Sequence, residues 1–226
     1  MWRPRGNSNL MAADFERWVD AVFDRPVGKP EWYWAPEFDE QWESLGLDGP
    51  TTVAYLTRLY RESSVLSRFP LEQVAQGIWF LVSESSPGQP SHYLLDGAIP
   101  LDRRVTCIRS IATFFRNFVA VAAPGASDAD RNPFHGACYM WWDIFPARWS
   151  GNEASEIDDA CLRTMVEVLQ LPSELCQLSA LHGLNHWHLG HADYVERTID
   201  AFLDRADDIT PRIREYAALA KRGRAQ

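Results

Sequence analysis

Apolar residues recur at intervals of three and four positions along much of this chain of 226 residues. An α-helix has about 3.6 residues per turn, so this spacing gathers apolar side chains on one helical face. No segment shows the strict apolar–polar alternation that is typical of a half-buried β-strand. The sequence therefore predicts an all-α fold. The clearest stripe occupies Phe15, Trp18, Val19, Val22 and Phe23.

Capping residues and glycines mark the ends of the other predicted helices. Thr210 and Pro211 supply a cap and a first helical residue for the last helix, whereas Gly190 is suited to end the helix before 195–203. The helix over 102–122, with Asp102 as its expected N-cap, is too apolar for a surface helix. We therefore expect it, together with 173–188, to be among the most buried.

A chain with 46% hydrophobic residues at this length can bury a sizeable core. We predict one all-α domain over residues 12–223, with possible halves 12–123 and 136–223, preceded by an extension at residues 1–11. The irregular stretches 83–91 and 124–136 are predicted surface loops. We expect about nine or ten helices stacked as antiparallel pairs, forming either an α-solenoid or an irregular helical bundle.

One weak internal similarity bears on that choice. CIRSIATFF, from Cys107, and CQLSALHGL, from Cys176, share Cys, Ser and an apolar residue at positions 1, 4 and 5, and start 69 residues apart. Two helix-pair repeats occupy about 70–90 residues. The chain thus resembles HEAT-like α-helical repeat proteins, and residues 155–223 resemble the terminal helix pairs of uncharacterised bacterial proteins that carry an LHGL-x-H sequence. This resemblance implies a protein-binding scaffold without a defined chemistry.

Cysteine spacing and hydropathy indicate a compartment. The four cysteines form no CxxC pair, so neither a zinc ribbon nor a disulfide framework is suggested. Residues 1–15 lack an apolar run of signal-peptide length, and we expect no membrane span. We predict a cytoplasmic protein with reduced thiols in its core.

Four of the six histidines fall within ALHGLNHWHLGH, residues 180–191. On a helix His182 and His186 share nearly one face, so at most two of the four converge. In the zinc-protease pattern HExxH a glutamate follows the first histidine, and here that position is Gly183. We interpret His182 and His186 as structural, buried and hydrogen-bonded residues. The alternative is a metal-binding pair completed by an acid such as Asp143 or Asp193.

Charge excludes one class of partner and favours another. The net charge is −9, and residues 31–50 carry six acids without a lysine or arginine. Acidic stretches repel phosphate, so direct binding of nucleic acid is disfavoured. A basic protein would instead be steered toward them. The alternative is that these acids form a solvated face that keeps the protein soluble.

Two clusters combine aromatic residues with acids. In YMWWDIFPARW, residues 139–149, we expect at least one of Trp141 and Trp142 in the core, because adjacent helical residues point about 100° apart. In EWYWAPEFDEQW, residues 31–42, the mixture leaves a partly exposed functional surface and a packed loop about equally favoured. The candidate partner-binding residues are Trp34, Asp39, Glu40, Trp42 and Glu43.

The sequence contains no phosphate-binding GxxxxGK, no GxGxxG after a strand, no GxSxG and no EF-hand loop. No catalytic residue is therefore nominated and no cofactor is predicted. We expect a non-catalytic helical scaffold, such as a bacterial immunity or adaptor protein, that binds a basic protein. The alternative is a metal-dependent hydrolase or a small-molecule-binding helical protein that uses His182 and His186.

Overall fold

The computed structural model describes residues 7–88, 90–122, 132–146, 156–205 and 209–225. Within these residues all regular structure is helical and no strand occurs, which confirms the all-α prediction. Four short 3₁₀ or π segments, η1 (Trp32–Trp34), η2 (Ser63–Arg68), η3 (Pro90–Leu94) and η4 (Phe115–Val119), connect or extend the helices. The α-helical segments are α1 (Asn7–Phe23), α2 (Phe38–Glu43), α3 (Gly49–Arg61), α4 (Leu71–Val82), α5 (Leu101–Phe114), α6 (Ala120–Ala122), α7 (Pro133–Tyr139), α8 (Trp141–Ile144), α9 (Glu156–Leu169), α10 (Glu174–Arg205) and α11 (Pro211–Ala220).

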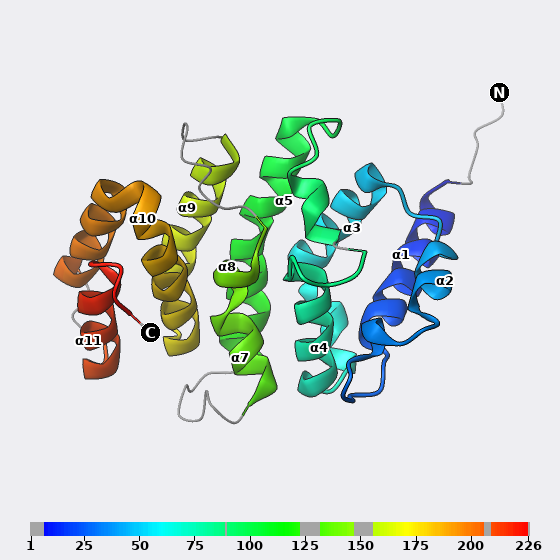
Figure 1. Ribbon diagram of the computed structural model, residues 1–226, viewed down its shortest axis with the longest axis horizontal. Helices are drawn as coiled ribbons and strands as arrows, with labels where there is room; N and C mark the ends of the chain where they lie inside the picture. The colour runs from blue at the N-terminus through cyan, green and yellow to red at the C-terminus, as the bar shows by residue number, and fades with distance from the viewer. Residues whose placement is uncertain (1–6, 89, 123–131, 147–155, 206–208, 226) are drawn as a thin grey trace.

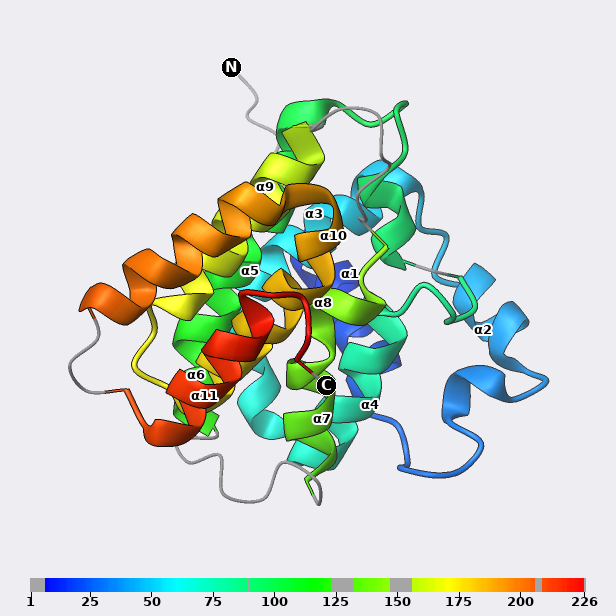
Figure 2. The same ribbon diagram turned by 60° about the vertical axis from the view of Figure 1, so that its left-hand side comes forward.

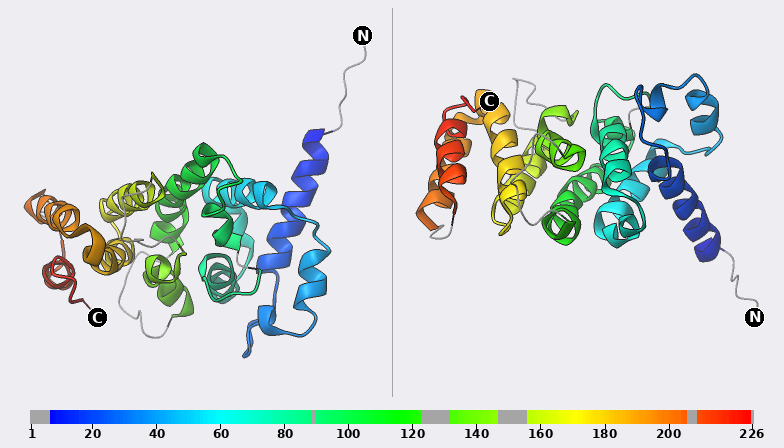
Figure 3. Two further views of the ribbon diagram at one scale, coloured as in Figure 1. Left: turned by 45° about the horizontal axis from the view of Figure 1, so that its top comes forward. Right: turned by 90° about the horizontal axis from the view of Figure 1, so that it is seen from below.

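The helices stack in two layers along the long axis of the molecule. From α3 to α11 they follow one another broadly in chain order, and α1 and α2 lie together at the opposite end from α11 (Figure 1). In one layer α3 packs on α5 and α5 on α9, and in the other α4 packs on α7 and α7 on α10. The two rows are visible in the left view of Figure 3. This arrangement agrees with the predicted stacking of helices, and one cluster of buried side chains extends from α1 to α11.

The long helix α10 serves as two helices of this stack. His191 interrupts it with non-helical backbone angles, φ −134° and ψ 37°. The halves on either side run in different directions (Figure 2), and the sequence places the break one residue earlier, at Gly190. The first half, which carries His182 and His186, packs against α7, α8 and α9.

The helices predicted to be the most buried do form part of the core. Ile111 in α5 and Leu181 in α10 have no exposed surface. The continuous helical stretch Leu101–Ala122 is long and apolar enough to cross a membrane, but half of its most apolar window is buried among other helices. Buried helices of soluble proteins share this property, so the stretch alone carries no conclusion about a membrane.

All four cysteines are buried and free, as expected of core thiols. Burial raises the pKa of Cys107 to about 12 and that of Cys176 to about 11. A thiol with a raised pKa is a poor nucleophile, because the thiolate is the reactive form.

Three predicted boundaries were wrong. Helix α1 begins at Asn7, so it includes residues 7–11 of the predicted extension; leucine, methionine and alanine there are strong helix formers. The predicted loop 124–136 ends earlier, because the Asn132 side chain accepts a hydrogen bond from the Phe134 N–H and Pro133 begins α7. The cap of α5 is Pro100, one residue before the helix, and not Asp102. Residues 1–6, 123–131 and 147–155 lie outside the described residues.

Candidate functional site

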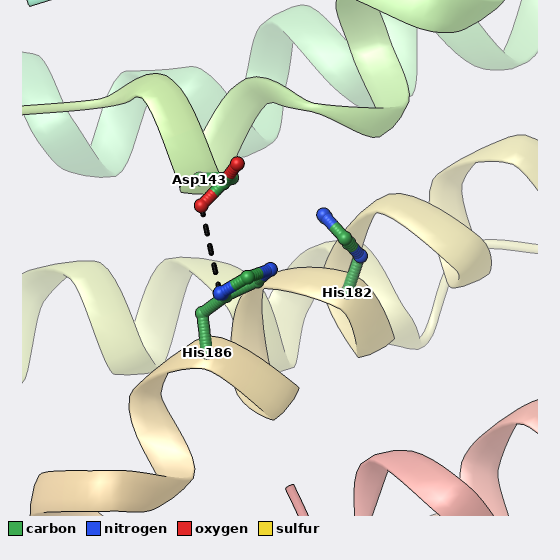
Figure 4. Close-up of side chains that lie close together, drawn as sticks. All are labelled: Asp143, His182 and His186. Carbon is green, nitrogen blue, oxygen red and sulfur yellow. Dashed lines mark ion pairs between the residues drawn. The ribbon is translucent and has the colours of Figure 1, made fainter. Parts of the chain in front are cut away.

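Two of the four clustered histidines meet an aspartate from a second helix. His182 and His186 lie one turn apart on α10, with their ring centroids 4.6 Å apart. Asp143 on α8 faces them, and its Oδ1 lies 3.5 Å from Nδ1 of His186 (Figure 4). One possible ligand atom from each of the three residues lies within 4.8 Å of the others. We refer to Asp143, His182 and His186 as the Asp–His–His cluster.

His182 is held by two tyrosines behind it. Its Nδ1 lies 2.9 Å from the hydroxyl of Tyr216 on α11, which in turn lies 2.6 Å from the hydroxyl of Tyr139 on α7. The ring of Tyr139 covers the imidazole, with centroids 4.1 Å apart. Burial lowers the pKa of His182 to about 4, and the neighbouring His186 adds to this effect while Asp143 opposes it. His182 is therefore neutral near pH 7.

One ring nitrogen of His182 has no hydrogen-bond partner. Nε2 is buried and makes no hydrogen bond with any of the described residues. Buried polar atoms are nearly always hydrogen-bonded, so each exception needs an explanation. In a neutral histidine whose Nδ1 carries the proton, Nε2 carries a lone pair that is available to a ligand.

The other two histidines of the stretch lie elsewhere. His188 Nε2 is 3.2 Å from a carboxylate oxygen of Glu196, and His191 stacks on Trp187 with ring centroids 5.8 Å apart. The prediction that at most two of the four converge is thus confirmed. Of the two acids predicted as completing ligands, Asp143 joins the group and Asp193 does not.

The two histidines that converge differ in how much of their surface is exposed. His182 is 5% exposed and hydrogen-bonded, as the structural interpretation predicted. The expected burial of His186 was wrong, because 43% of its side chain is exposed. Gly183, one turn earlier on α10, packs against Trp142 of α8. His186 lies beyond this packed region, so its imidazole is at the solvent-exposed edge of the contact between α8 and α10.

The second candidate region is the acidic-aromatic segment, residues 31–43, which comprises η1 and α2. Four of its five aromatic rings surround Phe80 of α4, at centroid distances of 4.8–5.6 Å. They are Trp32, Tyr33, Phe38 and Trp42. The candidate residue Trp42 is therefore partly buried against the core and is not a free anchor.

Trp34 differs from these four rings because 52% of its surface is exposed. It borders two surface hollows. One has a volume of about 690 Å³ and extends along α4 to Glu72, Gln76 and Trp79. The other has a volume of about 430 Å³ and reaches Tyr93. Because Trp34 lines both hollows, its ring stands between two concave surfaces at the edge of the segment.

The acids predicted to bind a partner face solvent. Asp39, Glu40 and Glu43 on α2 are all exposed. None of the three takes part in an ion pair with another described residue. Two further acids, Glu31 and Glu72, line the larger hollow beside Trp34, where Lys29 is the lone cation among its described lining residues. A second cation, Arg25, donates a hydrogen bond to Gln41 and lies over the ring of Trp32, so the acids of this side outnumber the cations near them but do not stand alone.

The residues that hold the two candidate regions in place could not be identified from the sequence. Nothing in the sequence pairs Tyr216 with His182, 34 positions away. Phe80 was missed as the centre of the aromatic cluster, since the apolar residues of α4 do not indicate which distant rings pack against them. In both cases the partners come from different helices, and only the packing of these helices brings them together.

Comparison with protein-family models, curated proteins and solved structures found no match to this chain.

Proposed function

We propose that this protein is a non-catalytic scaffold that binds a basic protein through the acidic-aromatic segment. The observation that carries the proposal is the exposure of Trp34, which stands between two hollows while the other four rings of the segment pack around Phe80. Tryptophan is among the residues that contribute most to protein interfaces, particularly beside a pocket. Leaving such a side chain in water is unfavourable unless a partner covers it.

The negative charge of the segment also favours this surface as the binding site for a basic protein. Asp39, Glu40 and Glu43 are exposed and in no ion pair among the described residues, so their field extends into solvent. Such a field attracts a basic partner and raises the association rate. The same field repels nucleic acid, which agrees with the net charge of −9.

The kind of scaffold follows from this chemistry. An acidic face with one aromatic anchor suits an immunity protein that neutralises a basic toxin, or an adaptor that holds a basic partner. We place the protein in the cytoplasm on the grounds of its four free, buried thiols.

Reversing the charge of the three α2 acids should slow association with the partner. The variant Asp39→Lys, Glu40→Lys, Glu43→Lys is expected to lower the association rate constant by about tenfold or more at low salt, because it removes the steering field. The rate of the wild type should fall steeply with salt, since exposed charges are screened over about 8 Å at physiological ionic strength. The partner is captured on immobilised protein from a lysate of the source organism, and association is then followed by surface plasmon resonance.

The matched control changes the same number of charges elsewhere. Asp193, Asp204 and Glu215 are exposed acids on α10 and α11. Their reversal to lysine should leave most of the association rate intact. Equal slowing by the two triple variants would mean that overall charge matters and would refute a local binding surface.

Truncating Trp34 should act on dissociation. Trp34→Ala is expected to raise the dissociation rate constant by about tenfold or more, as loss of an aromatic anchor does. Leu189→Ala is the control, because Leu189 is 82% exposed on α10, away from the segment. A captured partner that dissociates from both variants at the wild-type rate would place the binding surface elsewhere.

A further inference from the structure

We propose that the Asp–His–His cluster binds a divalent transition cation of the zinc class, with Asp143, His182 and His186 as its protein ligands. Two imidazoles and one carboxylate form the donor set that zinc takes in sites with three protein ligands. The three residues come from α8 and from one face of α10, and Figure 4 shows their side chains gathered in the contact between these helices.

The distances fit a cation after a small adjustment. One ligand atom from each residue lies within 4.8 Å of the others, and the Asp143–His186 pair is at 3.5 Å. Ligands at about 2.0–2.1 Å from a tetrahedral zinc lie about 3.3–3.4 Å apart. The widest separation in the cluster therefore needs to close by up to about 1.5 Å. Asp143 and His186 can supply this movement, because their side chains are 34% and 43% exposed, whereas His182 is buried.

The buried histidine provides an independent observation. His182 is more than nine-tenths buried, and its Nε2 has no hydrogen-bond partner among the described residues. Its other nitrogen, Nδ1, lies against the hydroxyl of Tyr216. In metal sites a ligating histidine almost always donates its second ring N–H to a neighbouring acceptor, which fixes the tautomer and the ring orientation.

Tyr216 and Tyr139 give His182 that orientation. If Nδ1–H donates to the Tyr216 oxygen, the Tyr216 hydroxyl is free to donate to the oxygen of Tyr139, 2.6 Å away. This arrangement leaves the lone pair of Nε2 for a cation.

Three protein ligands leave a fourth coordination position open. The side chains of Asp143 and His186 are both partly exposed, so this position faces solvent and can take a water molecule or a donor atom from a partner. The position that holds a general base in HExxH is occupied here by Gly183, whose Cα faces the Trp142 side chain and Met165. We therefore assign metal binding to the cluster and no hydrolytic step.

The experiment measures the binding of Zn²⁺ to the chain of 226 residues. After treatment with a chelator and dialysis, isothermal titration with Zn²⁺ is expected to show one site per chain, whereas Mg²⁺ and Ca²⁺, which prefer oxygen ligands, should not bind at this site. His186→Gln and Asp143→Asn should each lower zinc affinity by about tenfold or more. Both residues are partly exposed, so circular dichroism should show that these variants remain folded.

Two further variants distinguish zinc binding at the Asp–His–His cluster from zinc binding elsewhere on the chain. Tyr216→Phe removes only the hydroxyl behind His182 and should lower affinity by about 10–100-fold, as the loss of an outer-shell partner does. His188→Gln, which changes the neighbouring His188–Glu196 pair, should leave affinity unchanged. Failure to bind zinc would overturn the proposal, as would binding that survives His186→Gln and Asp143→Asn or is lost with His188→Gln. These results are independent of whether the acidic-aromatic segment binds a protein.

Discussion

Replacing Trp141 by alanine is expected to lower the free energy of unfolding by about 3–5 kcal/mol, the range seen when a large aromatic side chain is removed from a core. Trp141 is 1% exposed. Its ring lies 5.4 Å from those of Phe114 and Phe115 and 5.8 Å from that of Tyr60, so it joins α8 to α3 and α5. Because a domain is stable by only about 5–15 kcal/mol, this single change should bring the protein close to unfolding.

The measurement is urea denaturation followed by circular dichroism, with Trp34→Ala as the control. Trp34 is the exposed tryptophan of η1, and its truncation should change the free energy of unfolding by no more than about 0.5 kcal/mol. Trp141→Phe keeps an aromatic ring and should fall between the two. If Trp141→Ala lowered the free energy of unfolding by less than about 1 kcal/mol, the packing of α8 against α3 and α5 would not depend on this ring. The control also shows whether Trp34→Ala is folded for the binding experiment.

Both tryptophans of α8 are buried, although the sequence predicted burial for at least one. The prediction assumed that neighbouring helical residues, about 100° apart, cannot face the same way. They do face different ways: Trp141 contacts α3 and α5, whereas Trp142 contacts Phe145 and lies against Gly183 of α10. In a stack of helices α8 has neighbours on two sides, so both directions are interior. Periodicity gives the direction of a side chain but not what lies there.

The same limit explains what could be predicted of the candidate sites. The i, i+4 spacing of His182 and His186 placed them on one face of a helix, because that relation lies within a single element. Asp143 could be named only as one acid among two, since the contact between α8 and α10 depends on tertiary packing. Trp42 was named as a candidate partner-binding residue, with a packed loop as the alternative for its segment, and it turns inward because Phe80 of α4 lies 4.8 Å from its ring.

The effect of adding one methyl group in α10 tests how tightly that contact is packed. A Cβ placed on Gly183 would lie 2.6 Å from Cβ of Trp142 and 2.7 Å from the sulfur of Met165. The Met165 side chain can move, but Cβ of Trp142 is fixed to the backbone of α8. Gly183→Ala should therefore push α8 and α10 apart and lower the free energy of unfolding by about 1–3 kcal/mol. This loss is expected in spite of alanine's higher helix propensity, which by itself favours the variant by up to about 1 kcal/mol.

Gly136→Ala is the matched control, and its expected effect has the opposite sign. Gly136 lies within α7, and a Cβ there would meet nothing within 4 Å. With no clash to offset the gain in helix propensity, this variant should be more stable than the wild type by about 0.5–1 kcal/mol. Both substitutions are followed by urea denaturation under the same conditions. If Gly183→Ala were as stable as Gly136→Ala, α8 and α10 would not be in the close contact that brings Asp143 to the two histidines. The stability of a glycine variant thus reports on the same helix contact that the proposed metal site requires.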